Sequence, residues 1–185
     1  MSTTGGGLCL FDDLEKESEL RNLIRHAKDD SEPAEFSHRS LGYNYQFSNI
    51  LAALGLSQLE DLPRQLERKK EIYHRYKKGL AGYNQINWMP EPVKGENNFW
   101  LSCAVLDDEK IKHKLQQYLR KAGIETRSLW KPMHMQEHLK TYPVYKPMLG
   151  EQLWKRGLAL PSGTGLTEDE QGFIIDQIRT VLETY

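Results

Sequence analysis

The feature that most constrains this chain is a polar, aromatic loop that runs straight into a helix of small apolar residues. The loop occupies residues 42–47 and carries Tyr-Asn-Tyr at 43–45. Ser48 or Asn49 can then cap the helix by accepting a hydrogen bond from a free first-turn amide. Residues 50–60 are rich in Ala, Leu and Gly, so another backbone can lie close against them. We interpret the loop as the wall of a site; the alternative is that its aromatic rings pack ahead of a core helix.

Composition excludes several classes of function. The 185 residues allow one domain of common size or a small domain with an extension, and 25 basic against 26 acidic residues give a net charge of -1. That balance offers no electrostatic basis for binding nucleic acid or an anionic membrane. No apolar run approaches a membrane span, and the N-terminus lacks the layout of a secretion signal. Cys9 and Cys103 lie in apolar runs without metal-ligand spacing. We expect buried thiols in a cytoplasmic protein that binds no metal, membrane or nucleic acid.

The first half of the chain predicts a strand and several helices. Three glycines lead into a short buried strand at 8–11, and an aspartate at 12 or 13 caps the next helix. Two further helices are predicted over 48–60 and 62–80, the second amphipathic with core-facing tyrosines. We assign residues 1–87 to one unit, the edge of a larger domain. Its two long helices would then expose apolar surface, which favours a homo-oligomer with two-fold symmetry.

Residues 88–185 alternate strands and helices and predict a small three-stranded α/β domain. The predicted elements are strands at 99–105, 124–127 and 158–161, a helix opened by Asp107 or Asp108 and closed by Gly123, a short helix near 153–154, and a terminal helix opened by a Thr167–Glu170 capping box.

A long loop inside this second unit, from 128 to about 148, is dense in Trp, Met, His, Tyr and Pro. Such a loop is usually functional, and this one is too apolar for disorder. His134 beside aromatic residues and the cations Arg127 and Lys131 could hold a phosphate-bearing ligand or relay a proton. The alternative is that the loop packs on a neighbouring subunit.

Four motifs in the same order resemble the DegT/DnrJ/EryC1/StrS family. They are Thr-Thr-Gly-Gly-Gly at 3–7, Tyr-Asn-Tyr-x-x-Ser-Asn at 43–49, Thr-Arg-x-x-Trp-x-Pro-Met-His at 126–134 and Pro-Ser-Gly-x-x-Leu-Thr at 161–167. Members are pyridoxal-phosphate-dependent aminotransferases that act on nucleotide-linked keto-sugars, with glutamate as the common amino donor. The resemblance covers essentially the whole chain and is nearest to members of exopolysaccharide, spore-coat and bacillosamine biosynthesis. It implies the C-terminal part of a fold-type I aminotransferase.

The resemblance also implies roles for residues of the two loops. Asn44 would donate to the phosphate of the pyridoxal phosphate bound by the partner subunit of a two-fold dimer, with Tyr43 shaping the wall. Arg127, Trp130 and His134 would help to receive the nucleotide-sugar. The family commonly has Arg where this chain has Gln46, so no fixed cation is expected there.

One family feature has no counterpart in the 185 residues. The lysine that binds the cofactor would fall immediately before Met1, so no catalytic residue is assigned, and Lys69, Lys70 and Lys131 are not given its role. We therefore expect the large sheet domain to be absent and the chain alone to be an inactive, truncated enzyme. A separate N-terminal half is the alternative partner to a second copy of the chain. The alternatives are a non-catalytic dimerisation or interaction module derived from the family, and a generic small α/β ligand-binding domain.

Overall fold

The computed structural model describes residues 2–29, 31, 36–38, 40–145 and 148–185. The chain divides into two compact units, Met1–Leu62 and Pro63–Tyr185, called here the first and second unit. This boundary lies earlier than the predicted division between residues 87 and 88. The reason is helix α3 (Leu62–Gly79), which buries Ile72 and Tyr76 in the core of the second unit.

The second unit contains a four-stranded antiparallel sheet in the order β1-β2-β4-β3. The strands are β1 (Ile86–Trp88), β2 (Ser102–Leu106), β3 (Arg127–Ser128) and β4 (Gly157–Leu160). The α/β class is confirmed, but the predicted number of three strands is wrong. The added strand, β1, has only three residues, too few for an alternating pattern, and exists because Ile86 pairs with Leu106.

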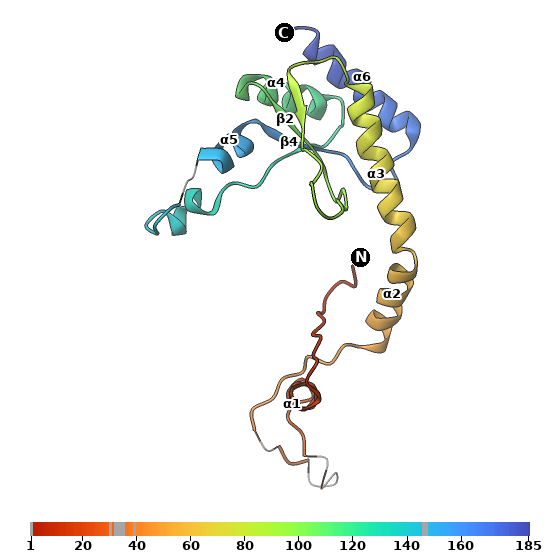
Figure 1. The fold of residues 1–185 in the computed structure, drawn as a ribbon, viewed down its shortest axis with the longest axis vertical. Helices are drawn as coiled ribbons and strands as arrows, with labels where there is room; N and C mark the ends of the chain where they lie inside the picture. Colours follow the sequence, from red (N-terminus) through yellow and green to blue (C-terminus); the bar gives the residue numbers. More distant parts are fainter. Residues whose placement is uncertain (1, 30, 32–35, 39, 146–147) are drawn as a thin grey trace. The chain divides into compact units, whose positions relative to one another are not determined.

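Helices pack on this sheet and close its core. They are α3, α4 (Glu109–Lys121), α5 (Met148–Arg156) and α6 (Glu168–Leu182), and two short 3₁₀ turns, η1 (Met133–Met135) and η2 (Glu137–Leu139), precede α5. Helices α3 and α6 run side by side (Figure 1), and a Cβ at Gly79 would lie 2.8 Å from a methyl of Ile175. The core comprises apolar residues of α3, α4, α6 and the sheet, chiefly Ile72, Tyr76, Leu80, Leu106, Leu115, Leu119, Leu158, Ile178 and Leu182.

The ends of the second unit's helices follow the sequence signals. Asp108 caps α4 by accepting from the Lys110 amide, and Gly123 ends that helix with φ of +76°. Thr167 and Glu170 form the predicted capping box of α6. These signals are local, so they do not depend on the rest of the fold.

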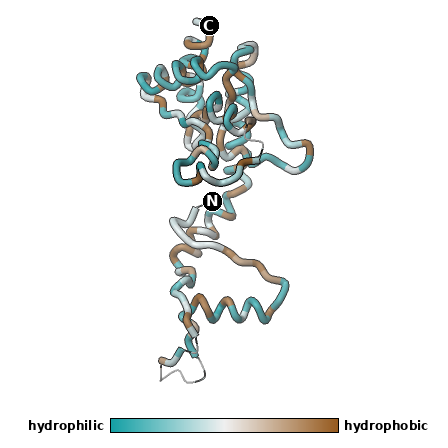
Figure 2. The backbone as a smooth tube through the Cα atoms, turned by 90° about the vertical axis from the view of Figure 1, so that its left-hand side faces the viewer, coloured by the Kyte–Doolittle hydropathy of each residue, from teal (hydrophilic) through white to brown (hydrophobic). Residues whose placement is uncertain are grey.

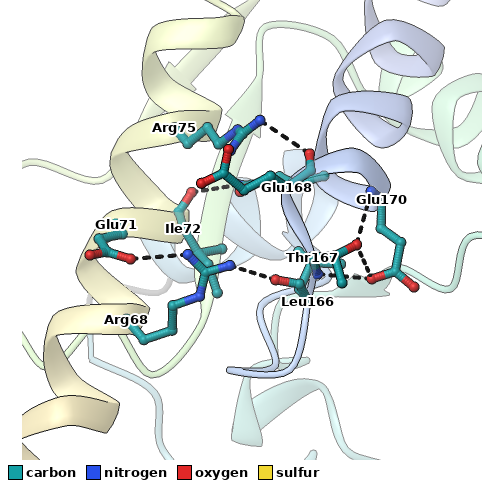
Figure 3. A network of polar contacts seen from close by, with 9 residues as sticks. Arg68, Glu71, Ile72, Arg75, Leu166, Thr167, Glu168 and Glu170 are labelled. Atoms are coloured by element: carbon teal, nitrogen blue, oxygen red, sulfur yellow. Dashed lines mark hydrogen bonds and ion pairs between the residues drawn. The ribbon is translucent and has the colours of Figure 1, made fainter.

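Polar contacts fix the turn before α6 against α3 (Figure 3). Arg68 donates to the Leu166 carbonyl at 2.6 Å and contacts Glu71 at 3.0 Å. Arg75 contacts the Glu168 carboxylate at 2.6 Å, and its hydrogen bond lowers the pKa of that carboxyl. The turn before α6 runs from Pro161 to Leu166. The contacts of Arg68 and Arg75 with its C-terminal end therefore hold this turn against α3.

The first unit has helices α1 (Leu14–Leu23) and α2 (Asn49–Glu60), capped by Asp13 and Ser48. Neither helix has a buried residue. The prediction of exposed apolar surface is therefore confirmed for α2. It is wrong for the C-terminal part of α3, whose apolar residues are buried.

The predicted buried strand at residues 8–11 is also wrong. This stretch is extended, with no ladder partner in the described part of the chain, and Leu8 and Leu10 are 84% and 86% exposed. It is the brown segment that leads into α1 in Figure 2. Cys9 is exposed with it, whereas Cys103 on β2 is half-buried, and burial raises the pKa of its thiol. An apolar run is buried only where another element covers it, and no element among the described residues covers this one.

Candidate functional site

Each unit contains one ligand-sized hollow that includes residues singled out from the sequence. The groove of the second unit has a volume of about 880 Å³, within the usual range for small-molecule sites. Its lining includes Lys69, Trp100, Arg127, Trp130, Ser162 and Phe173.

Two tryptophans form an aromatic surface in this groove. The Trp100 and Trp130 rings are 5.7 Å apart between centroids and tilted by 32°. They remain 63% and 66% exposed, so both indoles offer a face to a ligand. Exposed indoles of this kind can stack on the planar ring of a ligand.

Arg127 lies at the same groove on strand β3. Its Nε and one terminal nitrogen both donate to a carboxylate oxygen of Glu125 at 3.1 Å, and its side chain is 81% exposed. The structure thus brings Arg127 and Trp130 together, with the arginine charge partly compensated by Glu125.

His134 is not among the residues that line the groove. Its Nε2 lies 2.9 Å from a carboxylate oxygen of Glu151 on α5, and both side chains are mostly buried. Nearby, the Lys131 ammonium lies over the Trp154 ring. These contacts hold the loop around residues 130–136 on α5 of its own unit.

Lys69 on α3 is a groove residue that the sequence did not indicate. Its ammonium donates to the carbonyls of Trp100 at 2.9 Å and Ser162 at 2.6 Å, and burial lowers its pKa. In the sequence Lys69 is one of several basic residues on a polar helix face, so no local signal separates it from its neighbours. Lys69 differs from its neighbours only because the loops that carry Trp100 and Ser162 approach α3 at this position.

The hollow of the first unit has a volume of about 940 Å³ and lies between residues 5–11, α1 and the loop at 44–48. The Tyr-Asn-Tyr loop is fixed to the end of α1 by backbone bonds. Tyr43 donates to the Leu23 carbonyl at 2.8 Å and Tyr45 to the Ile24 carbonyl at 3.0 Å. The rings of Tyr43 and Tyr45 are stacked 5.4 Å apart.

Gly42 is required for this attachment. A Cβ at that position would lie 2.1 Å from the carbonyl carbon of His26 and 2.2 Å from the nitrogen of Ala27, distances that no side chain tolerates. The glycine therefore lets the loop approach the end of α1 closely enough for its backbone hydrogen bonds to form.

Asn44 lines this hollow, with an exposed side chain that makes no hydrogen bond to the described residues; Tyr43 is not among the lining residues. Ser48, the N-cap of α2, and the glycines at 5–7 lie around the same hollow. Amide donors and a helix N-terminus can hold a phosphate group. Arg21, which also lines the hollow, is paired with Glu17, and the other donors around Asn44 are neutral.

Within the described residues, no group of three or more His, Cys, Asp or Glu side chains could hold a metal ion. None of the described helices is long and apolar enough to cross a membrane.

Comparison with known proteins gives consistent matches over nearly the whole chain. Residues 1–179 match the DegT/DnrJ/EryC1/StrS aminotransferase family. EpsN of Bacillus subtilis (strain 168), whose name describes it as a pyridoxal phosphate-dependent aminotransferase, is 36% identical over 195 residues, covering 100% of this chain and 48% of EpsN. GDP-perosamine synthase of Escherichia coli O157:H7 is 31% identical over 149 residues, covering 78% of this chain and 39% of that protein.

A solved structure shares the fold. The aminotransferase TlmJ from Streptoalloteichus hindustanus matches with a TM-score of 0.81 and 21% identity, covering 94% of this chain and 47% of TlmJ. The chain thus spans about half the length of the relatives that it matches.

Proposed function

Because the chain belongs to the DegT/DnrJ/EryC1/StrS aminotransferase family, we propose that it is the C-terminal part of a pyridoxal-phosphate-dependent aminotransferase. Its substrates would be nucleotide-linked keto-sugars of surface-polysaccharide synthesis, with glutamate as amino donor. The observation that carries this proposal is the meeting of Arg127 and Trp130 in one groove of ligand size. Relatives named as a pyridoxal phosphate-dependent aminotransferase and as GDP-perosamine synthase support the substrate class.

The described residues would bind and orient the ligands. When bound, pyridoxal phosphate supplies an electron-withdrawing ring and carries the amino group between donor and acceptor. The Asn44 amide and the capped N-terminus of α2 would hold its phosphate through neutral hydrogen-bond donors. The stacked Tyr43 and Tyr45 give that loop a rigid wall. Trp130 and Arg127 would receive the nucleotide-sugar, while His134 positions their loop through Glu151.

None of Lys69, Lys70 and Lys131 is proposed as the cofactor-binding lysine. Lys69 is held by two carbonyls, Lys131 lies over Trp154, and Lys70 faces Glu67 at 3.7 Å. None of the three lies at the hollow that contains Asn44. The chain alone should therefore lack transaminase activity.

We also propose that the chain forms a two-fold dimer in which Asn44 serves the partner's cofactor. The apolar residues of the first unit support this, because α1 and α2 bury none of theirs within the unit. A cytoplasmic location is consistent with the free thiols of Cys9 and Cys103.

The test is a titration of the 185-residue chain with pyridoxal phosphate. We expect the cofactor to raise the melting temperature of the wild type and to raise it less for Asn44→Ala. The matched control is Asn84→Ala, an exposed amide of the second unit. After borohydride reduction the intact mass should be unchanged, and glutamate should give no transamination. A covalent adduct would show that a lysine within the chain binds the cofactor.

The second candidate is a non-catalytic interaction module that keeps the family's dimer-forming helices. The observation that favours it is the lack of an assignable cofactor lysine among the described residues of the Asn44 hollow. Equal melting temperatures with and without pyridoxal phosphate, in a chain that still dimerises, would select this candidate.

A further inference from the structure

We propose that α4 carries a docking surface for a second copy of this chain, and that the acidic face of that copy's α1 occupies it. The basic stripe of α4 consists of Lys110, Lys114 and Lys121, and the acidic face of α1 consists of Glu15 and Glu19. This contact adds to the proposed two-fold dimer, in which the apolar surface of α2 lies at the interface. It involves neither cofactor nor substrate, so it can be tested separately from both.

The two units carry opposite net charges. Residues 1–62 contain 11 acidic and 5 basic side chains, and residues 63–185 contain 15 acidic and 20 basic ones, giving net charges of -6 and +5. The net charge of -1 for the whole chain conceals this division. The first unit of one copy is therefore attracted to the second unit of another, because their electrostatic potentials are complementary.

The basic stripe is exposed, and no carboxylate neutralises it. Its lysines are four and seven positions apart, so they lie on one side of α4 over a length of about 16 Å. All three are exposed, and none forms an ion pair with the described residues. Lys114 lies over the Tyr185 ring, a contact that leaves its charge in place. Glu109, at the start of the helix, faces His113 at 3.4 Å instead.

The acidic face of α1 has matching properties. Its two glutamates are four positions apart, which is also the spacing of the first two lysines of the basic stripe. Both are exposed, and neither forms an ion pair with the described residues. The other charges of this helix are paired, Lys16 with Asp13 and Arg21 with Glu17. Because α1 buries none of its residues, its acidic face remains open to another helix.

Each surface also contains a repulsion that a second copy would relieve. Like charges four positions apart destabilise the helix that carries them. Lys110 and Lys114 form such a pair on α4, and Glu15 and Glu19 form one on α1. When the two helices lie side by side with these pairs opposite each other, attractions between copies offset both repulsions. The equal spacing lets both lysines meet both glutamates at once.

The contact is expected to direct assembly rather than to supply most of its affinity. Exposed ion pairs are individually weak, but several together orient two proteins and speed their encounter. Each copy has one α1 and one α4, so a two-fold dimer forms the contact twice. The signature of such a contact is association that weakens as salt is added.

The test is sedimentation of the 185-residue chain at about 50 mM and about 500 mM salt. We expect the dissociation constant of the wild type to rise about tenfold at the higher salt. At low salt, reversal of the basic stripe should weaken association by a similar factor, and so should reversal of the acidic face. The stripe is reversed by Lys110→Glu, Lys114→Glu and Lys121→Glu, and the acidic face by Glu15→Lys and Glu19→Lys.

The matched control reverses three exposed lysines elsewhere in the second unit, Lys77→Glu, Lys78→Glu and Lys94→Glu. It makes the same change in net charge and should alter the dissociation constant by less than about twofold.

A chain that carries both reversals gives the sharpest result. Its stripe is acidic and its α1 is basic, so the attraction returns, and the dissociation constant should recover to within about threefold of the wild type. Thermal melting followed by circular dichroism checks that each variant folds. If a reversed variant does not fold, the salt dependence of the wild type and the neutral variants Lys114→Gln and Glu19→Gln decide the outcome.

Four results would overturn the inference. They are wild-type association that salt leaves unchanged, a stripe reversal that acts no more strongly than the control, a combined variant that associates no better than either reversal alone, and a chain that binds polyphosphate through the stripe while it stays monomeric. Failure here is distinct from failure of the proposed function, because Ile50→Asp tests the α2 contact and Asn44→Ala tests the cofactor site.

Discussion

The hydroxyl of Tyr76 is the clearest place to test how the second unit holds its groove. The side chain is fully buried, and its oxygen donates to the Pro161 carbonyl at 2.9 Å. Pro161 precedes Ser162, whose carbonyl accepts from Lys69. Tyr76→Phe keeps the ring but leaves the Pro161 carbonyl without this donor. The change therefore tests one hydrogen bond that links the core to the groove.

The expected cost is about 1.5 kcal/mol, the usual loss when a partly buried acceptor loses its donor. With a urea m-value of about 1.5 kcal/mol/M, the unfolding midpoint should fall by about 1 M. Tryptophan fluorescence is the suitable probe, because all four tryptophans lie between residues 88 and 154 of the second unit.

Tyr83→Phe is the matched control. Its hydroxyl donates to Glu183 at 2.7 Å at an exposed position, so we expect a change within about 0.5 kcal/mol. If Tyr76→Phe and Tyr83→Phe unfold at the same urea concentration, the buried hydroxyl does not stabilise the turn, and this account of the groove is refuted.

Three other predictions concern the helix cap, alkaline pH and assembly. Thr167→Ala removes the cap of α6 and should cost about 1 kcal/mol, or about 2–4 °C in melting temperature by calorimetry; an unchanged value would contradict the capping geometry. Burial raises the pKa of Tyr76 and Tyr73, so the stability that their neutral forms provide is complete below about pH 10 and is lost as the pH rises further. Urea midpoints should therefore stay level from about pH 8 to about pH 10 and fall above about pH 10, less steeply in Tyr76→Phe, and parallel curves would exclude this linkage. Ile50→Asp on the exposed face of α2 should shift the dimer towards monomer in sedimentation, whereas Val93→Asp should not; equal behaviour of the two variants would argue against α2 as the interface.

The sequence predicted the features whose causes lie within a few residues. The helix ends lie at positions that the residue types predict, namely the caps Ser48, Asp108 and Thr167 and the terminating glycine Gly123. Each signal works because a side chain satisfies a backbone group of its own helix end. The family motifs around Asn44 and Trp130 can likewise be recognised from the sequence alone, because the residues of each motif are contiguous in the chain.

Other features needed the tertiary structure. Strand β1 exists only because Ile86 meets Leu106, and the run at 8–11 looks like a buried strand although no described element covers it. The contact of His134 with Glu151 on α5 likewise joins residues that are 17 positions apart in the chain.

The sequence by itself determined the family, the capped helices and the two loops that carry Asn44 and Trp130. Only the tertiary structure decided that Lys69 becomes a fixed cation. Its partners, Trp100 and Ser162, are 31 and 93 residues away. Local motifs encode hydrogen bonds within one turn of the chain, whereas a groove depends on which distant backbones the packed core brings together.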